Sequence, residues 1–456
     1  MGLIFYALVS FTNHKPRSCV RSAIKAPVDD KQVLMKLAGS DAPWFLLDMM
    51  EKTGSEIFRA TSKYHIVGDY ETARKILLDK ESVKPTNYRF FKVLFGSDNI
   101  LTHVQNDQFW HKVRKAVNRS MSSSEVSRMN RICTEHLNKW VKETLEPCIE
   151  KDEPFDPAHE MSRIIFKVVT EATFEYVISD EEYETFGHHV SIGLQETLRI
   201  AHGGRLRQLY APLLSEHRNG MKSCSEVQGF ARKVLNAYRN NANKSANNTT
   251  IKLLEVPGVC VDDTHRIAEI SFLLLAGHET AANTISTTLV LLAKHPRIQD
   301  KLRSSLLSVD SNSRSKCEFM RHVITESNRL LPVTALGSVR EVGRDISCKN
   351  GSITIPKGAT VYLPQLLLHR NPRVFKDPAT FNPERWENAT EAMTASVMPF
   401  SLGQRNCPGQ SLALVEFNSM ISKLLTEYSF QLEKEGNIFF HTNMGFVGAS
   451  LKASKM

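Results

Sequence analysis

Hydrophobic and polar positions are mixed over two short stretches in the first part of the chain. Glu56 to Thr61 and Lys63 to Val67 are rich in β-branched and aromatic residues, and a turn separates them. This pattern predicts two adjacent strands. From Glu71 to about Arg239 the apolar residues follow helical spacing, and the polar, Asn-rich stretch from Asn240 to Thr250 predicts a surface loop.

The longest uninterrupted helical pattern runs from Thr264 to Lys294 and contains no proline. Polar residues at its start can cap the N-terminus, and His295-Pro296 ends it. About thirty residues at 1.5 Å each give a helix of roughly 45 Å, the width of a whole domain. His278 and Glu279 at its centre make a membrane span that faces lipid unfavourable.

The pattern changes to short strands in the last third of the chain. Asn350-Gly351 lies between Asp345 to Cys348 and Ser352 to Ile355, which is a strong signal for a hairpin. Ala359 to Leu363 continues as a strand, and a final helix is expected from about Gln410 to Glu427.

Together these elements predict a mainly α fold with a smaller β-sheet region formed by distant parts of the chain. No linker divides it, so residues 31–456 are expected to form a single domain. Residues 1–30 are set apart, because Leu3 to Phe11 is apolar but too short to span a bilayer, and basic residues follow it. We interpret residues 1–30 as a targeting segment or a vestigial anchor.

Charge and cysteine content narrow the class of protein. The chain has 456 residues and a net charge of +9, but no basic run or basic stripe interleaved with aromatics indicates a nucleic-acid partner. None of the eight cysteines belongs to a C-x-x-C pair, so zinc-ribbon and thioredoxin folds are not expected. Only Cys407 lies in a sequence setting that suggests chemistry.

Residues 400 to 409 read Phe-Ser-Leu-Gly-Gln-Arg-Asn-Cys-Pro-Gly. Gly403 and Gly409 bracket Cys407, which allows a tight turn and the close approach of a flat ligand. Pro408 is expected to begin a helix, and the partial positive charge at the N-terminus of a helix favours a thiolate. Arg405 can offer a cation to a propionate. The alternative is a buried structural cysteine in a glycine-containing turn.

Five spaced identities coincide in this segment, F-x-x-G-x-R-x-C-x-G, of which Phe400 is the first. The segment resembles the haem-binding loop of cytochrome P450 enzymes at every defining position. The resemblance implies that haem b is the cofactor and that Cys407 is the proximal ligand of its iron. It also implies the cytochrome P450 fold, in which a long central helix lies over a haem held by a cysteine loop.

A second motif lies midway along the long helix and reads Ala276-Gly277-His278-Glu279-Thr280. Gly277 makes room beside the helix, Thr280 offers a hydroxyl and Glu279 an adjacent acid, which together could hold dioxygen and pass protons to it. The segment is similar to the family's oxygen-activation motif, which implies that Thr280 and Glu279 are catalytic and that Ala276 and Gly277 contact the cofactor. Helix packing is the plain alternative for such residues. A zinc-protease motif is not present, because residue 282 is alanine.

Other residues resemble family positions that hold the core or the propionates. Glu326 and Arg329 match an E-x-x-R element that partners a later arginine, here Arg385, and this triad is interpreted as structural. Trp110 and Arg114 resemble a W-x-x-x-R helix that reaches one propionate. The other propionate position is matched by Arg340. An ordinary surface arginine and a core aromatic remain the alternatives at these three positions.

The resemblance implies a haem-thiolate monooxygenase that inserts one atom of dioxygen into an organic substrate. No G-x-G-x-x-G follows a strand in a βαβ setting, so electrons are expected from a separate NADPH-dependent flavoprotein reductase or a ferredoxin. A basic face could dock an acidic partner of this kind. The family is commonly anchored to the endoplasmic reticulum, so peripheral contact with that membrane or with an organelle stays open.

The same resemblance places an apolar substrate pocket in five stretches, with Phe90, Phe91, Phe272 and Phe446 as candidate walls. These stretches are Tyr88 to Thr102, parts of Val190 to Tyr210, Ile270 to Leu274, Val333 to Leu336 and Phe440 to Phe446. Two other functions remain open. One is a haem-thiolate isomerase or dehydratase, against which Thr280 and Glu279 argue, and the other is a haem sensor or carrier without turnover.

Overall fold

The computed structural model describes residues 23–25, 33, 36–37, 39–202, 207, 209–440 and 443–456. Its α-helices are α3 (Ala42–Thr53), α4 (Tyr70–Leu78), α5 (Lys92–Phe95), α6 (Gln108–Ser120), α7 (Val126–Trp140), α8 (Glu146–Glu150), α9 (Pro157–Phe174), α10 (Asp180–His202), α12 (Ser215–Asn240), α13 (Thr250–Leu254), α14 (Asp263–Lys294), α15 (Pro296–Leu307), α16 (Glu318–Leu330), α17 (Gln365–His369), α18 (Glu391–Ser396) and α19 (Gln410–Glu427). Its strands are β1 (Ile24–Lys25), β2 (Ile57–Arg59), β3 (Tyr64–Val67), β4 (Ser338–Glu341), β5 (Ile346–Cys348), β6 (Ile353–Ile355), β7 (Thr360–Leu363), β8 (Tyr428–Lys434), β9 (Asn437–Phe440), β10 (Met444–Val447) and β11 (Ser450–Lys455).

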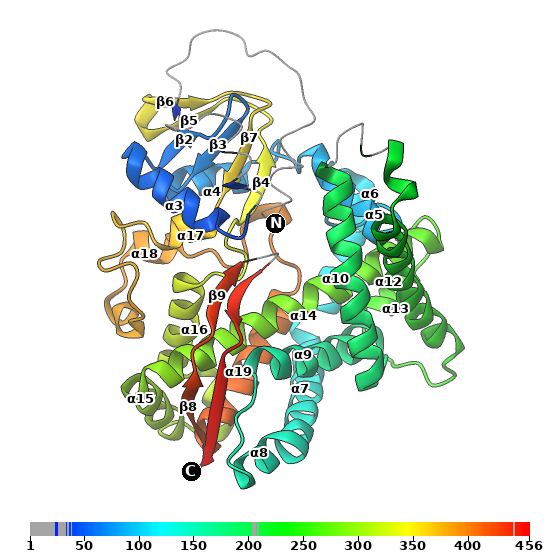
Figure 1. Ribbon diagram of the computed structural model, residues 1–456, viewed down its shortest axis with the longest axis vertical. Helices are drawn as coiled ribbons and strands as arrows, with labels where there is room; N and C mark the ends of the chain where they lie inside the picture. The colour runs from blue at the N-terminus through cyan, green and yellow to red at the C-terminus, as the bar shows by residue number, and fades with distance from the viewer. Residues whose placement is uncertain are drawn as a thin grey trace.

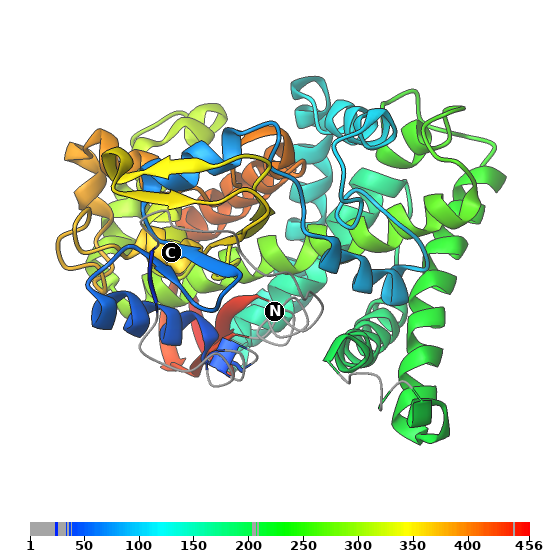
Figure 2. The same cartoon turned by 90° about the horizontal axis from the view of Figure 1, so that it is seen from above.

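The largest sheet joins strands from opposite parts of the chain in the order β1-β2-β3-β7-β4. The early strand β3 pairs in parallel with the late strand β7, with Tyr64 opposite Thr360 and Ile66 opposite Tyr362. Figure 1 shows this sheet at one end of the molecule and the long helices α10 and α12 at the other, and Figure 2 shows the same division from above. The mainly α fold with a smaller sheet region is confirmed.

The sheet includes chain that precedes residue 31. Ile24 and Lys25 form β1 and pair in parallel with Phe58 and Arg59 of β2. These two residues fall within the segment 1–30 that the sequence set apart, while Leu3 to Phe11 lies outside the described residues. We find no helix, within the part of the chain that is described, with the length and apolar character needed to cross a membrane.

Helix α14 runs through the middle of the molecule between the sheet and the helices α10 and α12 (Figure 1). It is 32 residues long, and the side chain of Asp262 caps it by accepting from the His265 N–H at 2.8 Å. Most of its residues are buried on all sides, because α9, α12 and α19 pack around it. The sequence placed this helix one residue later at its start and correctly at its end, Lys294.

A buried ionic cluster joins α16 to the segment that precedes the cysteine loop. Arg329 donates from Nε and Nη2 to the two carboxylate oxygens of Glu326, at 2.8 and 2.9 Å. Arg385 adds a 3.0 Å bond to the same carboxylate, and Trp386 adds one of 2.9 Å. Both Glu326 and Arg329 are fully buried, so every lone pair and proton of the pair needs the partner that the fold provides. The triad is therefore structural, as its sequence pattern indicates.

The loop predicted from Asn240 to Thr250 ends differently in the structure. Thr250 begins the short helix α13, and Thr249 and Thr250 are buried rather than exposed. Their hydroxyls find partners inside the protein: Thr249 donates to Glu175 at 2.7 Å, and the Thr250 hydroxyl lies 2.6 Å from that of Ser120. The end of this polar stretch can therefore lie in the core, because the Thr249 and Thr250 hydroxyls have hydrogen-bond partners there.

Candidate functional site

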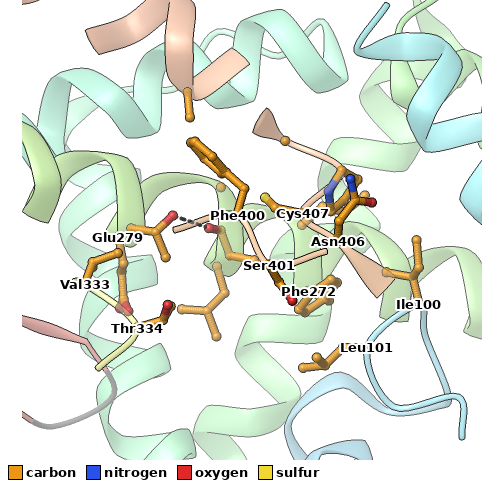
Figure 3. A pocket seen from close by; sticks show the side chains of 18 of the residues that line it. Ile100, Leu101, Phe272, Glu279, Val333, Thr334, Phe400, Ser401, Asn406 and Cys407 are labelled. Carbon is orange, nitrogen blue, oxygen red and sulfur yellow. Dashed lines mark hydrogen bonds between the residues drawn. The ribbon is translucent and has the colours of Figure 1, made fainter. Parts of the chain in front are cut away.

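A cavity of about 410 Å³ lies between the loop that carries Cys407 and the middle of α14. In the view of Figure 3, Glu279 and Val333 lie on one side of the cavity and Ile100 and Asn406 on the other, with Cys407 between them. The cavity therefore brings together segments that are far apart in the sequence.

The backbone of the cysteine loop is held by a hydrogen bond and by close packing. The Cys407 N–H donates to the Phe400 carbonyl oxygen at 2.8 Å, which closes the loop. Gly403 has a φ of 74°, and a Cβ there would lie 2.1 Å from the carbonyl oxygen of Leu77 in α4, so only glycine fits. Phe400 and Gly409 line the cavity with Cys407, whereas Gly403 faces α4.

Helix α19 begins at Gln410 with Gly409 as its N-cap, two residues later than the start expected at Pro408. The apolar pattern placed this start correctly at about Gln410, but the expectation that Pro408 begins the helix was wrong, because residues 408 and 409 form a turn. Cys407 is accessible from the cavity. Burial raises the pKa of its thiol, while the backbone hydrogen bond of Gly409 and the charge of Arg114 lower it.

Two arginines tie the cysteine loop to its surroundings. Arg114 of α6 donates to the Asn406 carbonyl oxygen at 2.7 Å and also to the Asn406 side-chain oxygen. Arg405 donates to four oxygens of the loop before α6, which are the carbonyl oxygens of Ile100, Val104 and Gln105 and Oδ1 of Asn106. Trp110, Arg114 and Arg405 all line the cavity. The partners of both guanidinium groups are thus neutral oxygens.

Arg340 and Lys84 add two more buried cations. Arg340 of β4 is 2% exposed, and its Nη2 has no hydrogen-bond partner among the described residues. Lys84 is 8% exposed and lines the cavity, with its Nζ over the Tyr88 ring at 4.2 Å. Burial, followed by the charges of Arg340 and Arg405, holds the pKa of Lys84 well below its usual value. Such a group of cations fits a ligand that carries carboxylates.

Sequence reasoning missed Lys84, because a single lysine in a loop belongs to no motif. Arg340, Arg405 and Arg114 were identified by their spacing to other motifs. A clue did exist in the sequence, since Lys84 precedes Pro85 and the first aromatic of the expected pocket, Tyr88.

On the opposite side of the cavity, α14 presents Ala276, Gly277, Glu279 and Thr280. The Thr280 hydroxyl donates to the Ala276 carbonyl oxygen at 3.0 Å, which leaves its lone pairs able to accept a hydrogen bond from a ligand. A Cβ at Gly277 would lie 3.1 Å from Cγ1 of Val169 in α9. The room expected beside Gly277 is thus partly taken up by α9.

Glu279 is the acid that faces the cavity from this helix. Burial raises its pKa to about 7, against the lowering effect of a hydrogen bond from Asn443. The Asn443 amide donates to Oε2 of Glu279 at 2.9 Å. Asn443 lies in a stretch that the sequence assigned to the pocket, but it was not singled out.

The cavity walls are largely aromatic and aliphatic, and each of the five expected stretches contributes. Phe91, Phe95 and Phe272 line the cavity, whereas Phe90 stacks behind Phe91 with 4.3 Å between ring centres. Phe446 is buried in the core and is not part of the lining. The candidates Phe90 and Phe446 were therefore misplaced, because periodicity does not tell which side of a buried segment faces a cavity.

Comparison with known proteins agrees with this geometry. The sequence model of the family described as Cytochrome P450 matches residues 33–454. "Probable cytochrome P450 516A1" of Dictyostelium discoideum is 36% identical over 178 residues, which cover 37% of this chain and 36% of that protein. "Cytochrome P450 3A56" of Fundulus heteroclitus is 26% identical over 405 residues, which cover 83% of this chain and 80% of that protein. The chain thus spans about a third of the length of the first relative and about four-fifths of the second.

Solved structures show the same fold. The crystal structure of the cytochrome P450DA heme domain superposes with a TM-score of 0.77 at 16% identity, over 95% of this chain and 98% of that one. The chain belongs to the cytochrome P450 family. Members of this family are haem-thiolate monooxygenases, which are oxidoreductases that use dioxygen, a substrate and a redox partner.

Proposed function

We propose that this chain is a haem-thiolate monooxygenase that inserts one atom of dioxygen into an apolar organic substrate, with electrons from a separate protein. One observation carries the proposal. A single cavity is lined by Cys407 on one side and by Glu279 and Thr280 on the other. A thiolate ligand and a route for protons are the two protein contributions that this chemistry requires.

Cys407 would ligate the iron of haem b, and Ala276, Gly277, Phe400 and Gly409 would contact its flat face. When bound, the haem supplies the redox chemistry by which dioxygen is activated. The small side chains of Ala276 and Gly277 leave space on the α14 side. Gly403 would act indirectly, by letting the cysteine loop pack closely on α4.

The buried cations would hold the two propionates. Nη2 of Arg340 has no hydrogen-bond partner among the described residues, and Nζ of Lys84 lies over the Tyr88 ring, so these two side chains have donors to offer. Arg405 has most of its donors engaged by the loop before α6, and Arg114 has two of its donors engaged by Asn406 of the cysteine loop. Arg114 and Arg405 would contribute positive charge and would shape the cavity wall, with Trp110 packed against Arg405. Lys84 is thus added to the propionate-binding residues that were inferred from the sequence.

Glu279 and Thr280 would manage protons. The Thr280 hydroxyl can accept a hydrogen bond while its own proton is held by the Ala276 carbonyl oxygen. Glu279, with a pKa of about 7, can both hold and release a proton near neutral pH. A carboxyl group beside an acceptor hydroxyl is suited to deliver a proton to the part of the cavity that faces α14.

The exposed face of α6 favours electron transfer from a separate protein. While Trp110 and Arg114 point inward, Lys112, Lys115 and Arg119 on the same helix are exposed. A basic surface directly behind the cysteine loop suits an acidic NADPH-dependent flavoprotein reductase or a ferredoxin. Docking there would bring the donor close to Cys407.

Peripheral membrane contact is part of the proposal. Leu209 and Leu213 are each 79% exposed and Tyr210 is half-exposed, and the three residues are close in the sequence between α10 and α12. An apolar surface of this kind suits the face of the endoplasmic reticulum or an organelle membrane. The protein should float with phospholipid vesicles in a density gradient. The double variant Leu209→Ser, Leu213→Ser should stay at the bottom of the gradient.

The deciding measurement is the absorbance of the dithionite-reduced protein before and after carbon monoxide. A strongly red-shifted Soret band that disappears in Cys407→Ala is expected. A band at the position of an imidazole complex, or a folded protein without haem, contradicts the proposal. Reductase-dependent NADPH oxidation with an oxygenated product separates a monooxygenase from a haem-thiolate isomerase or a haem sensor.

A further inference from the structure

Asn443, the residue before β10, places an amide against the acid of α14. Nδ2 of Asn443 donates to Oε2 of Glu279 at 2.9 Å, and both side chains line the cavity. The bond leaves Oε1 of Glu279 as the oxygen that can carry and release a proton. An amide N–H can donate to a carboxyl oxygen whether the acid is protonated or ionised, so this contact persists through a cycle of proton transfer.

The position of Asn443 is fixed by its neighbours in the chain. The Met444 N–H donates to the Val333 carbonyl oxygen at 2.8 Å, which attaches β10 to another segment of the cavity wall. On the next residue, a Cβ at Gly445 would lie 2.8 Å from Oδ1 of Asn283, so the backbone lies directly against α14. Pairing of Met444 with Phe440 holds β10 to β9. The backbone that follows Asn443 is thus anchored to the cavity wall and packed against α14.

We propose that Asn443 is a positioning residue, whose amide holds the Glu279 carboxyl group in the orientation from which it passes protons into the cavity. A glutamate side chain has three rotatable bonds, and a buried carboxyl group with no fixed partner adopts several rotamers. The Asn443 amide selects one of them. This inference rests on the proposed function, because the role of Glu279 in proton transfer belongs to it.

Infrared spectroscopy tests the contact without turnover. The C=O stretch of protonated Glu279 is identified as the band that Glu279→Gln removes. In Asn443→Leu, which has similar volume and no donor, this band is expected at a higher wavenumber, because the carbonyl oxygen loses a hydrogen bond. Asn437→Leu, at the exposed start of β9, is the matched control and should leave the band in place. An unmoved band in Asn443→Leu overturns the proposal.

A double-mutant cycle tests the functional consequence, with 7-ethoxycoumarin as an apolar probe substrate. Asn443→Leu and Glu279→Gln are each expected to lower the product formed per NADPH by roughly tenfold. The double variant should be no worse than Glu279→Gln alone, because Asn443 acts through Glu279. Losses that multiply overturn the proposal. If Glu279→Gln alone has no effect, the proton role in the proposed function fails, while the infrared band still reports on the contact.

Discussion

The guanidinium group of Arg405 lies over the ring of Trp110, with 3.9 Å between its central carbon and the ring centre. The indole N–H of Trp110 donates to the Ile100 carbonyl oxygen at 3.0 Å, and Arg405 donates to the same oxygen at 3.1 Å. One backbone carbonyl and one aromatic face thus connect α6 to the cysteine loop. Stacking keeps the buried cation of Arg405 in a defined plane.

Replacing Trp110 should separate the two contributions. Trp110→Phe keeps an aromatic face and loses one hydrogen bond, so the protein should lose about 1 kcal/mol of stability and retain most of its haem. Trp110→Ala also leaves a cavity and should cost about 3–5 kcal/mol, with loss of haem on gel filtration. Urea unfolding and the ratio of Soret to protein absorbance measure the two effects. Equal behaviour of the two variants would show that the aromatic face is unimportant.

Removal of Lys84 should weaken cofactor retention. In Lys84→Met the loss of a buried cation that can pair with a propionate is expected to speed transfer of haem to apomyoglobin by roughly tenfold. Lys80→Met, an exposed lysine nearby in the chain, is the control. Unchanged transfer in Lys84→Met would mean that Arg340 and the other arginines bind the propionates without it.

The buried Glu326–Arg329 pair should be far more important for stability than a surface pair on the same helix. Glu326→Gln leaves the Arg329 charge buried without a full counter-charge, at an expected cost of about 3–5 kcal/mol. Glu318→Gln breaks an exposed pair with Arg321 and should cost no more than about 0.5 kcal/mol. Urea midpoints of the two variants test this difference directly. Similar midpoints would contradict the structural role of the triad.

Coupling of NADPH oxidation to product should depend on pH through Glu279. Its pKa of about 7 means that the protonated form prevails below pH 7 and the ionised form above it. If the protonated carboxyl group is the donor, product per NADPH should fall as pH rises through about 7. The Glu279→Gln variant should show a low and flat profile. A wild-type profile that is equally flat would remove Glu279 from the proton route.

His369 should make the protein sensitive to acid. Its Nε2 accepts from the Met398 N–H at 3.1 Å and its Nδ1 lies 3.0 Å from the Asn328 carbonyl oxygen, so the ring is neutral, and burial lowers its pKa to about 3. The unfolded chain therefore takes up this proton at a higher pH than the folded protein does. Stability should therefore fall as the pH drops from about 6.5 toward 3. Over this range the equilibrium constant for unfolding should rise by up to tenfold per pH unit. His369→Gln should lose this part of the slope, while the exposed His188→Gln should keep it.

Much of the fold was predictable because its main elements carry strong local patterns. The final helix was expected from Gln410 to Glu427 and has those limits. The hairpin at Asn350-Gly351 is present, and Asn350 adopts the left-handed backbone that the turn requires, with a φ of 55°. The C-terminal strands β8 to β11 were not predicted. They are held by pairing with one another and by contacts with α8 and α14, which a local pattern does not reveal.

In the site, too, residues that belong to a local sequence pattern were predicted, and residues placed only by tertiary contacts were not. Residues in spaced motifs, such as Cys407 and Thr280, were found and face one cavity. Lys84 and Asn443 were missed, because each is a single residue whose importance comes from what the fold brings beside it. Gly403 was found for its motif, but its backbone conformation serves contact with Leu77 and not the cavity lining.

The central sheet also has a consequence for biosynthesis. Strand β3 emerges from the ribosome early, whereas its parallel partner β7 begins only at Thr360. At about 5–20 residues per second, the edge of β3 stays without that partner for some tens of seconds. A nascent chain with an open apolar edge is a natural client for chaperones and prone to aggregation. Co-expression of a chaperone should therefore raise the soluble yield of this protein.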